Sequence, residues 1–394
     1  MEIVNVQSYI MGVPHRRNWV FCKVETDDGL EGWGECPAPW LREHTHAQAL
    51  REYGKRFMIG QDPFDIEAIW EALYKTAGSY SDTGRSAHSH HFQHPGVFHG
   101  QVVGALEMAC WDIVGKALHQ PIYRLLGGVK NPKLRAYTYL HNVAEWHVGD
   151  PPEKAGAAAA EVVEHGFTLF KFDPIPGGSP FNPSVRYPRD VSLKELRYTD
   201  MVLKHMRDAI GEDCDIAMGT HGQLNTHSAI RYAKILEKHD CLWFEEPVPL
   251  ENVDEMARLA RHTTIPIAQG ERLSTKWDFR LVLEKQAAQI LQIMVGQNGI
   301  LESKKIAGMA EAYNAQVAPW MACGPVNAAA NIQLDVTCPN FLAQEGIGNM
   351  MGIYAEILEE PIRIEKGFVL PSTKPGLGIG RVKEELLEKY PYNP

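Results

Sequence analysis

Charged residues follow several short apolar runs of this 394-residue chain. One run ends in Lys171 and, two residues later, Asp173, and other runs end at Glu245, Glu271 and Glu345. Side chains alternate along a strand, so Lys171 and Asp173 share one face. Glu245 and Glu271 are 26 residues apart, one strand–helix repeat, so adjacent parallel strands would bring both to one edge. Two converging carboxylates suit a hard cation such as Mg²⁺.

Each of these residues also has a plain structural interpretation. An isolated glutamate at a strand end is often a helix-capping or salt-bridge residue. Five histidines lie in the polar segment 79–100 without metal-ligand spacing, and we expect this loop to line a surface or to cover a substrate. Cys323 has no acid–base partner near it in the sequence, so we expect a structural thiol. Trp320 fits either the core or a pocket wall. Only the set as a whole indicates chemistry.

The elements that must position this set alternate regularly after residue 128. Short apolar runs separated by amphipathic stretches are typical of βαβ units and a parallel sheet. The expected strands are 134–140, 169–173, 216–220, 241–246, 265–271, 290–294, 316–320 and 341–345. The expected helices are 153–165, 194–210, 226–238, 251–262, 276–285, 301–313 and 325–335. Eight repeats indicate an α/β fold of the (β/α)₈-barrel type, with its active site at the carboxyl ends of the strands. A doubly wound open sheet is the alternative, but the turn after the first strand lacks G-x-G-x-x-G.

The first third of the chain has a different pattern. We expect strands over 2–10, 19–25 and 30–35, the last two joined as a hairpin at Asp27-Asp28-Gly29. Helical patterns follow over 45–58, 65–75 and 100–118. This part is therefore a mixed α and β region that precedes the barrel.

Composition and charge exclude several classes of protein. With 39 basic against 49 acidic residues the formal net charge is −10, and such a surface repels nucleic acid and anionic lipid. Seven scattered cysteines without a C-x-x-C pair indicate reduced thiols. We see no signal peptide, and no apolar run of membrane-spanning length. We therefore expect a cytoplasmic homo-oligomer with no nucleic-acid or membrane partner.

Many segments resemble the enolase superfamily, in the same order along nearly the whole chain. The resemblance is to the mandelate racemase-like branch, which includes sugar-acid dehydratases of the galactonate and mannonate type. The segments include GWGECP (32–37), ALEMACWDIVGKALHQPIYRLLGG (105–128), FKFDP (170–174), THGQ (220–223), WFEEPVPLEN (243–252), PIAQGERL (266–273), GPVNAAA (324–330) and KPGLGIG (374–380).

The resemblance implies how the chain is divided. It implies an α+β capping domain over 1–127, a (β/α)₈-type barrel over 128–370 and a C-terminal segment over 371–394 that returns to the cap. Loops of such a cap select the substrate. We therefore assign His91 and His94, in the polar loop, to substrate binding.

The resemblance also implies a chemistry. Members of the superfamily remove a proton next to a carboxylate while Mg²⁺ stabilises the enediolate. Glu245 and Glu271 match two ligands of that cation. Lys171 matches a base, whose pKa must be lowered before it can accept a proton at neutral pH. Glu345 matches an acid that hydrogen-bonds the enediolate, and His221 is the expected proton donor. The substrate is a small carboxylate, and its further contacts are assigned to Asp173, Arg272 and Trp320.

The chain departs from the family pattern at three positions. Gly219 stands where the third strand would end in a third acidic ligand, so we expect weaker cation binding, which Gly219→Asp would tighten. Met294 and Trp320 stand where the family has an Asp–His dyad. A racemase commonly uses bases on both faces of its substrate, so the loss of the dyad argues against racemisation.

Three functions remain open at this point. The first is Mg²⁺-dependent dehydration of an aldonate-type sugar acid through an enediolate, giving a 2-keto-3-deoxy acid. The second is epimerisation or cycloisomerisation of a similar acid or lactone. The third is a protein that keeps the fold without the usual catalysis, since fold does not imply function. Retention of Lys171, His221, Glu245, Glu271 and Glu345 favours the dehydratase.

Overall fold

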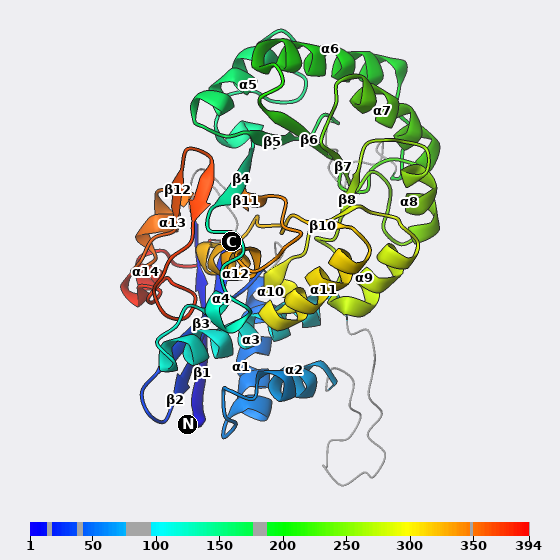
Figure 1. Ribbon diagram of the computed structural model, residues 1–394. Coiled ribbons are helices and arrows are strands. Elements are labelled where there is room, and N and C mark those ends of the chain that lie inside the picture. Colours follow the sequence, from blue (N-terminus) through cyan, green and yellow to red (C-terminus); the bar gives the residue numbers. More distant parts are fainter. Residues whose placement is uncertain (14–17, 38–41, 76–95, 176–186, 347–349, 394) are drawn as a thin grey trace.

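The computed structural model describes residues 1–13, 18–37, 42–75, 96–175, 187–346 and 350–393. Figure 1 shows a ring of strands and helices, coloured green to yellow, beside the N-terminal strands and helices in blue. The C-terminal segment, in orange to red, lies along both parts.

The N-terminal part is a three-stranded antiparallel sheet covered by helices. Its order is β1-β2-β3. Its elements are β1 (Ile3–Met11), β2 (Trp19–Thr26), β3 (Glu31–Cys36), α1 (Glu43–Tyr53), the π-helix η1 (Gly54–Met58), α2 (Ile66–Lys75) and α3 (Val97–Ala117). Helix α3 lies against β3 so closely that a Cβ on Gly32 or Gly34 would overlap the backbone of α3. The sheet and its helices match the expected pattern, except that the helix expected over 45–58 ends in a π turn.

The barrel is closed by eight parallel strands in chain order. The strands are β4 (Leu134–Tyr139), β5 (Leu169–Phe172), β6 (Asp215–Gly219), β7 (Trp243–Glu245), β8 (Ile267–Gln269), β9 (Ile290–Leu291), β10 (Gln316–Val317) and β11 (Gln344–Gly346). Strand β11 pairs with β4, and a single bridge between Val317 and Phe341 joins the last two strands. Closure confirms the barrel and excludes the open sheet.

Helices connect successive barrel strands. They are α5 (Lys154–Glu164), α6 (Leu193–Ile210), α7 (Thr226–Lys238), α8 (Val253–Ala260), α9 (Thr275–Glu284), α11 (Ile300–Ala312) and α12 (Pro325–Asp335). Short helical segments add α4 (Ile122–Leu125), η3 (Leu140–Asn142) and α10 (Val295–Asn298). Several strands are shorter than the apolar runs because the chain turns out of the sheet early. Glu246, for example, has a φ of +40° directly after β7.

Residues 350–393, which follow β11 and are called the C-terminal segment from here on, contact both parts of the molecule. It contains α13 (Ile353–Glu356), β12 (Arg363–Glu365), β13 (Phe368–Leu370) and α14 (Glu384–Lys389). Strand β13 pairs antiparallel with β4. Glu384 forms an ion pair of 2.8 Å with Lys23 of β2. The division of the chain after residues 127 and 370 stays a prediction.

Three buried acids of the N-terminal part accept main-chain N–H groups from the rest of the chain. Glu35 accepts from the first residues of α12, and Glu107 accepts from Ile300 and Leu301 of α11 at 2.7 and 2.9 Å. Asp112 accepts from Leu377 at 2.9 Å. The bonds of Glu35 and Glu107 join the two parts at helix ends, whose N–H groups lack partners within their own helix.

Among the described residues, none of the helices has the length and apolar character of a membrane span. The expected cytoplasmic location stays a prediction.

Candidate active site

The inward positions of the barrel strands carry the predicted site residues. One inward layer is apolar and consists of Tyr137, Leu169, Ala217, Trp243, Ala268, Ile290, Ala318 and Ala343. Two residues further along their strands, the same alternation brings Lys171, Gly219, Glu245 and Glu345 to the next layer. The predicted alternation therefore gathers these residues above the core of the barrel.

Glu245 is the centre of the site and is fully hydrogen-bonded. Lys171 Nζ lies 2.8 Å from its Oε1 and 3.0 Å from its Oε2. Trp243 Nε1 and Gln292 Nε2 also donate to Oε2, at 3.1 and 2.6 Å. The sequence analysis missed Trp243 and Gln292 as partners, although both stand at inward positions of their strands.

Lys171 is enclosed by carboxylates and aromatic rings. Its Nζ lies 3.3 Å from Oε1 of Glu345 and 4.7 Å from the ring centroid of Tyr139. Burial alone would lower the pKa of Lys171, but the charges of Glu245 and Glu345 outweigh burial and hold it well above its ordinary value. Lys171 is therefore an ammonium group in this arrangement, without the lowered pKa that a base requires. Met321 N–H donates to Glu345 Oε2 at 2.6 Å and orients that carboxylate.

Glu246 directly follows β7, and Glu271 comes two residues after the end of β8. Burial and then the charge of Glu245 raise the pKa of Glu271 to about 7. Burial and then the charge of Glu271 raise the pKa of Glu246 to about 7. Arg272 binds Glu246 through Nε at 2.8 Å, and this Nε lies 3.7 Å from Glu271 Oε1. Arg272, assigned to substrate binding, thus has a carboxylate partner within the protein; its role stays a prediction.

A cavity of about 460 Å³ opens at the carboxyl ends of β4, β5 and β6. Its lining includes Asp173 and His221, together with His141 and His147, which the sequence analysis did not single out. His221 Nδ1 lies 3.8 Å from Asp173 Oδ2, and both side chains are partly exposed, at 41 % and 36 %. Burial raises the pKa of Asp173 above its ordinary range. The cavity therefore joins a carboxylate and imidazole groups beside Lys171.

Three other predicted residues are not placed in this cavity. Trp320 is partly buried, and its main-chain carbonyl accepts a hydrogen bond from Asn331, but it is not part of the lining. His91 and His94 lie outside the described residues. The substrate-binding roles of all three stay predictions.

The donor set can be tested for its fit to a divalent cation. Among the described residues, no three His, Cys, Asp or Glu side chains form a ready metal-binding group. The chemistry and charge fit nevertheless, because carboxylate oxygens are hard donors. Glu271, with a side chain 10 % exposed, makes no hydrogen bond to a described residue. The charges around Glu271 include three carboxylates, Glu245, Glu246 and Glu345, and two basic groups, Lys171 and Arg272.

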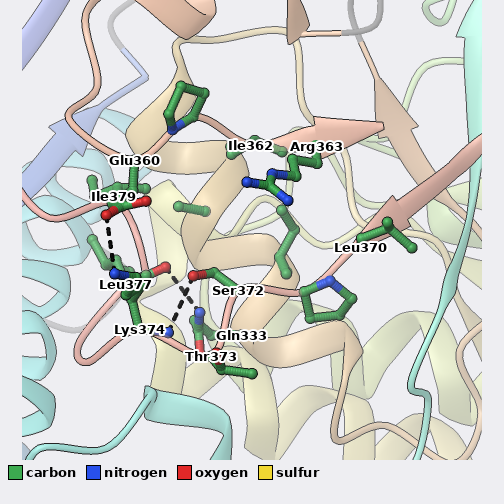
Figure 2. A pocket seen from close by; sticks show the side chains of 15 residues that line it. Gln333, Glu360, Ile362, Arg363, Leu370, Ser372, Thr373, Lys374, Leu377 and Ile379 are labelled. Atoms are coloured by element: carbon green, nitrogen blue, oxygen red, sulfur yellow. Dashed lines mark hydrogen bonds and ion pairs between the residues drawn. The ribbon is translucent and has the colours of Figure 1, made fainter. Parts of the chain in front are cut away.

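A second cavity, of about 240 Å³, lies beside the C-terminal segment. Figure 2 shows Lys374, Glu360, Arg363 and Gln333 around it. Lys374 pairs with Glu360 at 3.2 Å, and Gln333 donates to the carbonyl of Leu377 at 2.9 Å. Gln333 thus joins α12 to the C-terminal segment, the Lys374–Glu360 pair lies within that segment, and none of the buried site carboxylates lines this cavity.

Comparison with known sequences decides the family. Residues 6–127 match the mandelate racemase/muconate lactonizing enzyme N-terminal domain, and residues 154–385 match the enolase C-terminal domain-like family. The chain belongs to the enolase superfamily. Within it, the chain has the two domains of the mandelate racemase/muconate lactonizing enzyme type.

Named relatives of this superfamily cover the chain from end to end. A D-galactonate dehydratase from Pectobacterium atrosepticum is 34 % identical over 397 residues, covering 98 % of this chain and 94 % of that protein. A D-galactonate dehydratase from Variovorax paradoxus is 33 % identical, covering 100 % and 95 %. The crystal structure of a mandelate racemase/muconate lactonizing enzyme from Sulfitobacter sp. is 35 % identical with a TM-score of 0.89, covering 100 % and 96 %. The resemblance in the sequence is thereby confirmed, and the family is one of enzymes.

Proposed function

We propose that this protein is a hydro-lyase that removes water from an aldonate-type sugar acid and yields a 2-keto-3-deoxy acid. The observation that carries the proposal is the similarity to D-galactonate dehydratases over 98–100 % of the chain. Buried carboxylates and a lysine at the barrel mouth support the same chemistry, since removal of a proton beside a carboxylate needs charge stabilisation.

Glu245 and Glu271 are the residues that would hold Mg²⁺. When bound, Mg²⁺ supplies positive charge to the substrate carboxylate as the neighbouring proton leaves. Lys171 is the proposed base. Once the charge of Glu245 is taken up by the cation, burial favours the neutral amine of Lys171. His221, at the edge of the cavity, is accessible enough to donate a proton to the departing hydroxyl. Glu345 holds one oxygen toward Lys171 and orients it.

The test is a screen of aldonates, D-galactonate among them, with purified protein and Mg²⁺ in D₂O. The expected result is a 2-keto-3-deoxy product that carries deuterium from solvent. A change of configuration with deuterium at the carbon next to the carboxylate, and no keto product, would show an epimerase instead. No product and no exchange from any acid would refute catalysis of this class.

A binding protein without the usual catalysis is the second candidate. The observation in its favour is that Met294 and Trp320 stand at the positions of the family's dyad, while Lys171 is held as an ammonium group by two carboxylates. Thermal stabilisation by aldonates without turnover would support this candidate. Homo-oligomerisation and the absence of nucleic-acid and membrane partners stay predictions.

A further inference from the structure

The space beside Gly219 is filled by a carboxylate from the neighbouring strand. A Cβ built on Gly219 would overlap Oδ1 of Asp173, at about the separation that Cβ and Oδ keep within an aspartate itself. The next atom, Tyr139 Oη, lies 3.5 Å away. Asp173 thus brings a carboxylate oxygen as close to this position as an acidic side chain at residue 219 would.

The strand register explains this placement. Phe172 of β5 pairs with Met218 of β6, so Asp173 follows beside Gly219. Gly219 in turn pairs with Glu245 of β7. Asp173 and Glu245 therefore flank a position that has no side chain of its own. The carboxylate of Asp173 can extend over that position only because residue 219 is glycine.

The carboxylate of Asp173 is also short of partners. Its Oδ1 is buried and finds no hydrogen-bond partner among the described residues. Its other oxygen has only the 3.8 Å approach of His221. A buried carboxylate oxygen without a donor is costly unless a positive charge or a hydrogen bond offsets it. The charges of His221 and Lys171 act on Asp173 but do not outweigh burial, and the ammonium group of Lys171 is engaged by Glu245 and Glu345.

We propose that Asp173 is the third carboxylate of a divalent-cation site with Glu245 and Glu271, in place of the side chain that residue 219 lacks. The proposal rests on the proposed function for the choice of Glu245 and Glu271. Lys171 occupies Glu245 in the structure described, so cation binding displaces its ammonium group from that carboxylate. The acidic ligand expected at the end of the third strand is thus supplied from the second.

The test measures Mn²⁺ binding by electron paramagnetic resonance and by calorimetry, without substrate. The variants are Asp173→Asn, which keeps the size of the side chain, and the double variant Asp173→Asn/Gly219→Asp. Asp173→Asn is expected to weaken binding about tenfold or more, since hard cations gain affinity from ligand charge. The double variant returns the charge at residue 219 and is expected to regain most of the affinity. Asp254→Asn, an exposed carboxylate on α8, is the matched control and leaves binding unchanged.

Thermal unfolding of each variant confirms that the comparison is made on folded protein. Wild-type affinity in Asp173→Asn overturns the proposal, and so does failure of wild-type protein to bind millimolar Mn²⁺. These failures are separate from failure of the proposed function. If cation binding depends on Asp173 but no keto product forms, the proposed cation site stands and the proposed hydro-lyase activity is refuted. If keto product forms but Asp173→Asn binds the cation like wild type, the activity stands and the proposed role of Asp173 is refuted.

Discussion

Lys171 and Glu245 form an ion pair whose side chains are 0 % and 2 % exposed. A buried pair of this kind stabilises a fold little in total, because both charges have lost their water. Removing one partner is different, since the other charge then stays buried alone. Lys171 is the cationic partner of two buried carboxylates, Glu245 and Glu345. At the scale of the residue, the ammonium group of Lys171 thus supplies the positive charge that balances these carboxylates when no metal ion is bound.

Lys171→Met keeps an unbranched side chain, one atom shorter, and removes its charge. Without a divalent cation, the free energy of unfolding is expected to fall by about 3–5 kcal/mol, because Glu245 and Glu345 lose their counter-charge. Mg²⁺ is expected to stabilise this variant more than wild type. Urea unfolding with and without Mg²⁺ measures both effects. Lys204→Met, which breaks an exposed pair with Asp208, is the control and should change stability by less than about 1 kcal/mol. Equal losses in the two variants would contradict the argument.

Gly219→Ala tests the same site from the other side. Its added Cβ meets the far end of the Asp173 side chain, which can turn away at small cost. Stability should therefore fall by less than about 1.5 kcal/mol. Mn²⁺ affinity is expected to fall about as much as in Asp173→Asn, because Asp173 is moved from its place. Gly308→Ala, on α11 with open space around it, is the control for calorimetry. Retained affinity in Gly219→Ala would show that Asp173 need not occupy that space.

The proposed role of Asp173 changes the outcome expected for Gly219→Asp. The sequence alone predicts that this variant tightens Mg²⁺ binding, on the view that the third carboxylate is missing. Since Asp173 already fills the space, the new side chain would replace one carboxylate by another. With Asp173 as a ligand, the Mg²⁺ affinity of Gly219→Asp measured by calorimetry is expected to differ from wild type by less than about threefold. A threefold change corresponds to less than half of the binding free energy of a tenfold change.

At the scale of the elements, the junction between the two parts depends on buried acids at helix ends. Glu107 of α3 is fully buried and accepts N–H groups at the start of α11. Burial raises the pKa of Glu107 to about 7, against an ordinary value of 4.5. Between these two values the folded chain holds a proton that the unfolded chain has released. Stability from this group is therefore present at the acid end of the window and is lost as the pH rises to about 7.

Glu107→Gln removes this titration. The difference in unfolding free energy between wild type and variant is expected to change with pH by up to about 1.4 kcal/mol per unit between pH 4.5 and 7. The stability of wild type relative to the variant falls as the pH rises toward 7. Glu35 is present in both proteins, so its contribution cancels in the difference. Urea unfolding at several pH values measures this difference in unfolding free energy. For the control variant Glu164→Gln, at an exposed position, the difference from wild type should not change with pH. A flat difference in Glu107→Gln would show that its pKa is ordinary.

The elements were predicted far better than the contacts between their side chains. The helix expected over 226–238 has those bounds, and each of the eight barrel runs overlaps a strand. Periodicity carries this information, because it records which face of an element is buried. Alternation also predicted that Lys171 and Asp173 share one face. It did not reveal that Asp173 extends over Gly219, because that contact depends on the register between two strands.

At the scale of the whole molecule, Asp112 joins three segments that are distant in the sequence. Its carboxylate, 0 % exposed, accepts the N–H groups of Trp33 at 3.1 Å and of Leu377 at 2.9 Å, and pairs with Lys116 at 2.8 Å. It therefore connects β3 and α3 of the N-terminal part with the C-terminal segment.

Asp112→Ala leaves the Lys116 charge and two N–H groups without this acceptor. The free energy of unfolding is expected to fall by about 3–5 kcal/mol. Cleavage by a protease should also begin in the segment after β13. Asp112→Asn keeps one oxygen acceptor and should lose less. Denaturant unfolding and limited proteolysis measure the two effects. Unchanged proteolysis in a destabilised Asp112→Ala would show that the acid does not hold the segment.

The hydrogen bonds of Glu35 and Asp112 also limit how early the N-terminal part can complete its contacts during synthesis on the ribosome. Glu35 finds its partners 289 to 292 residues later, and Asp112 waits 265 residues for Leu377. At about 5–20 residues per second, this interval lasts on the order of tens of seconds. These contacts of the N-terminal part are thus completed only after α12 and Leu377 have been synthesised. During that time the buried carboxylates of Glu35 and Asp112 lack the N–H groups that they accept in the completed fold.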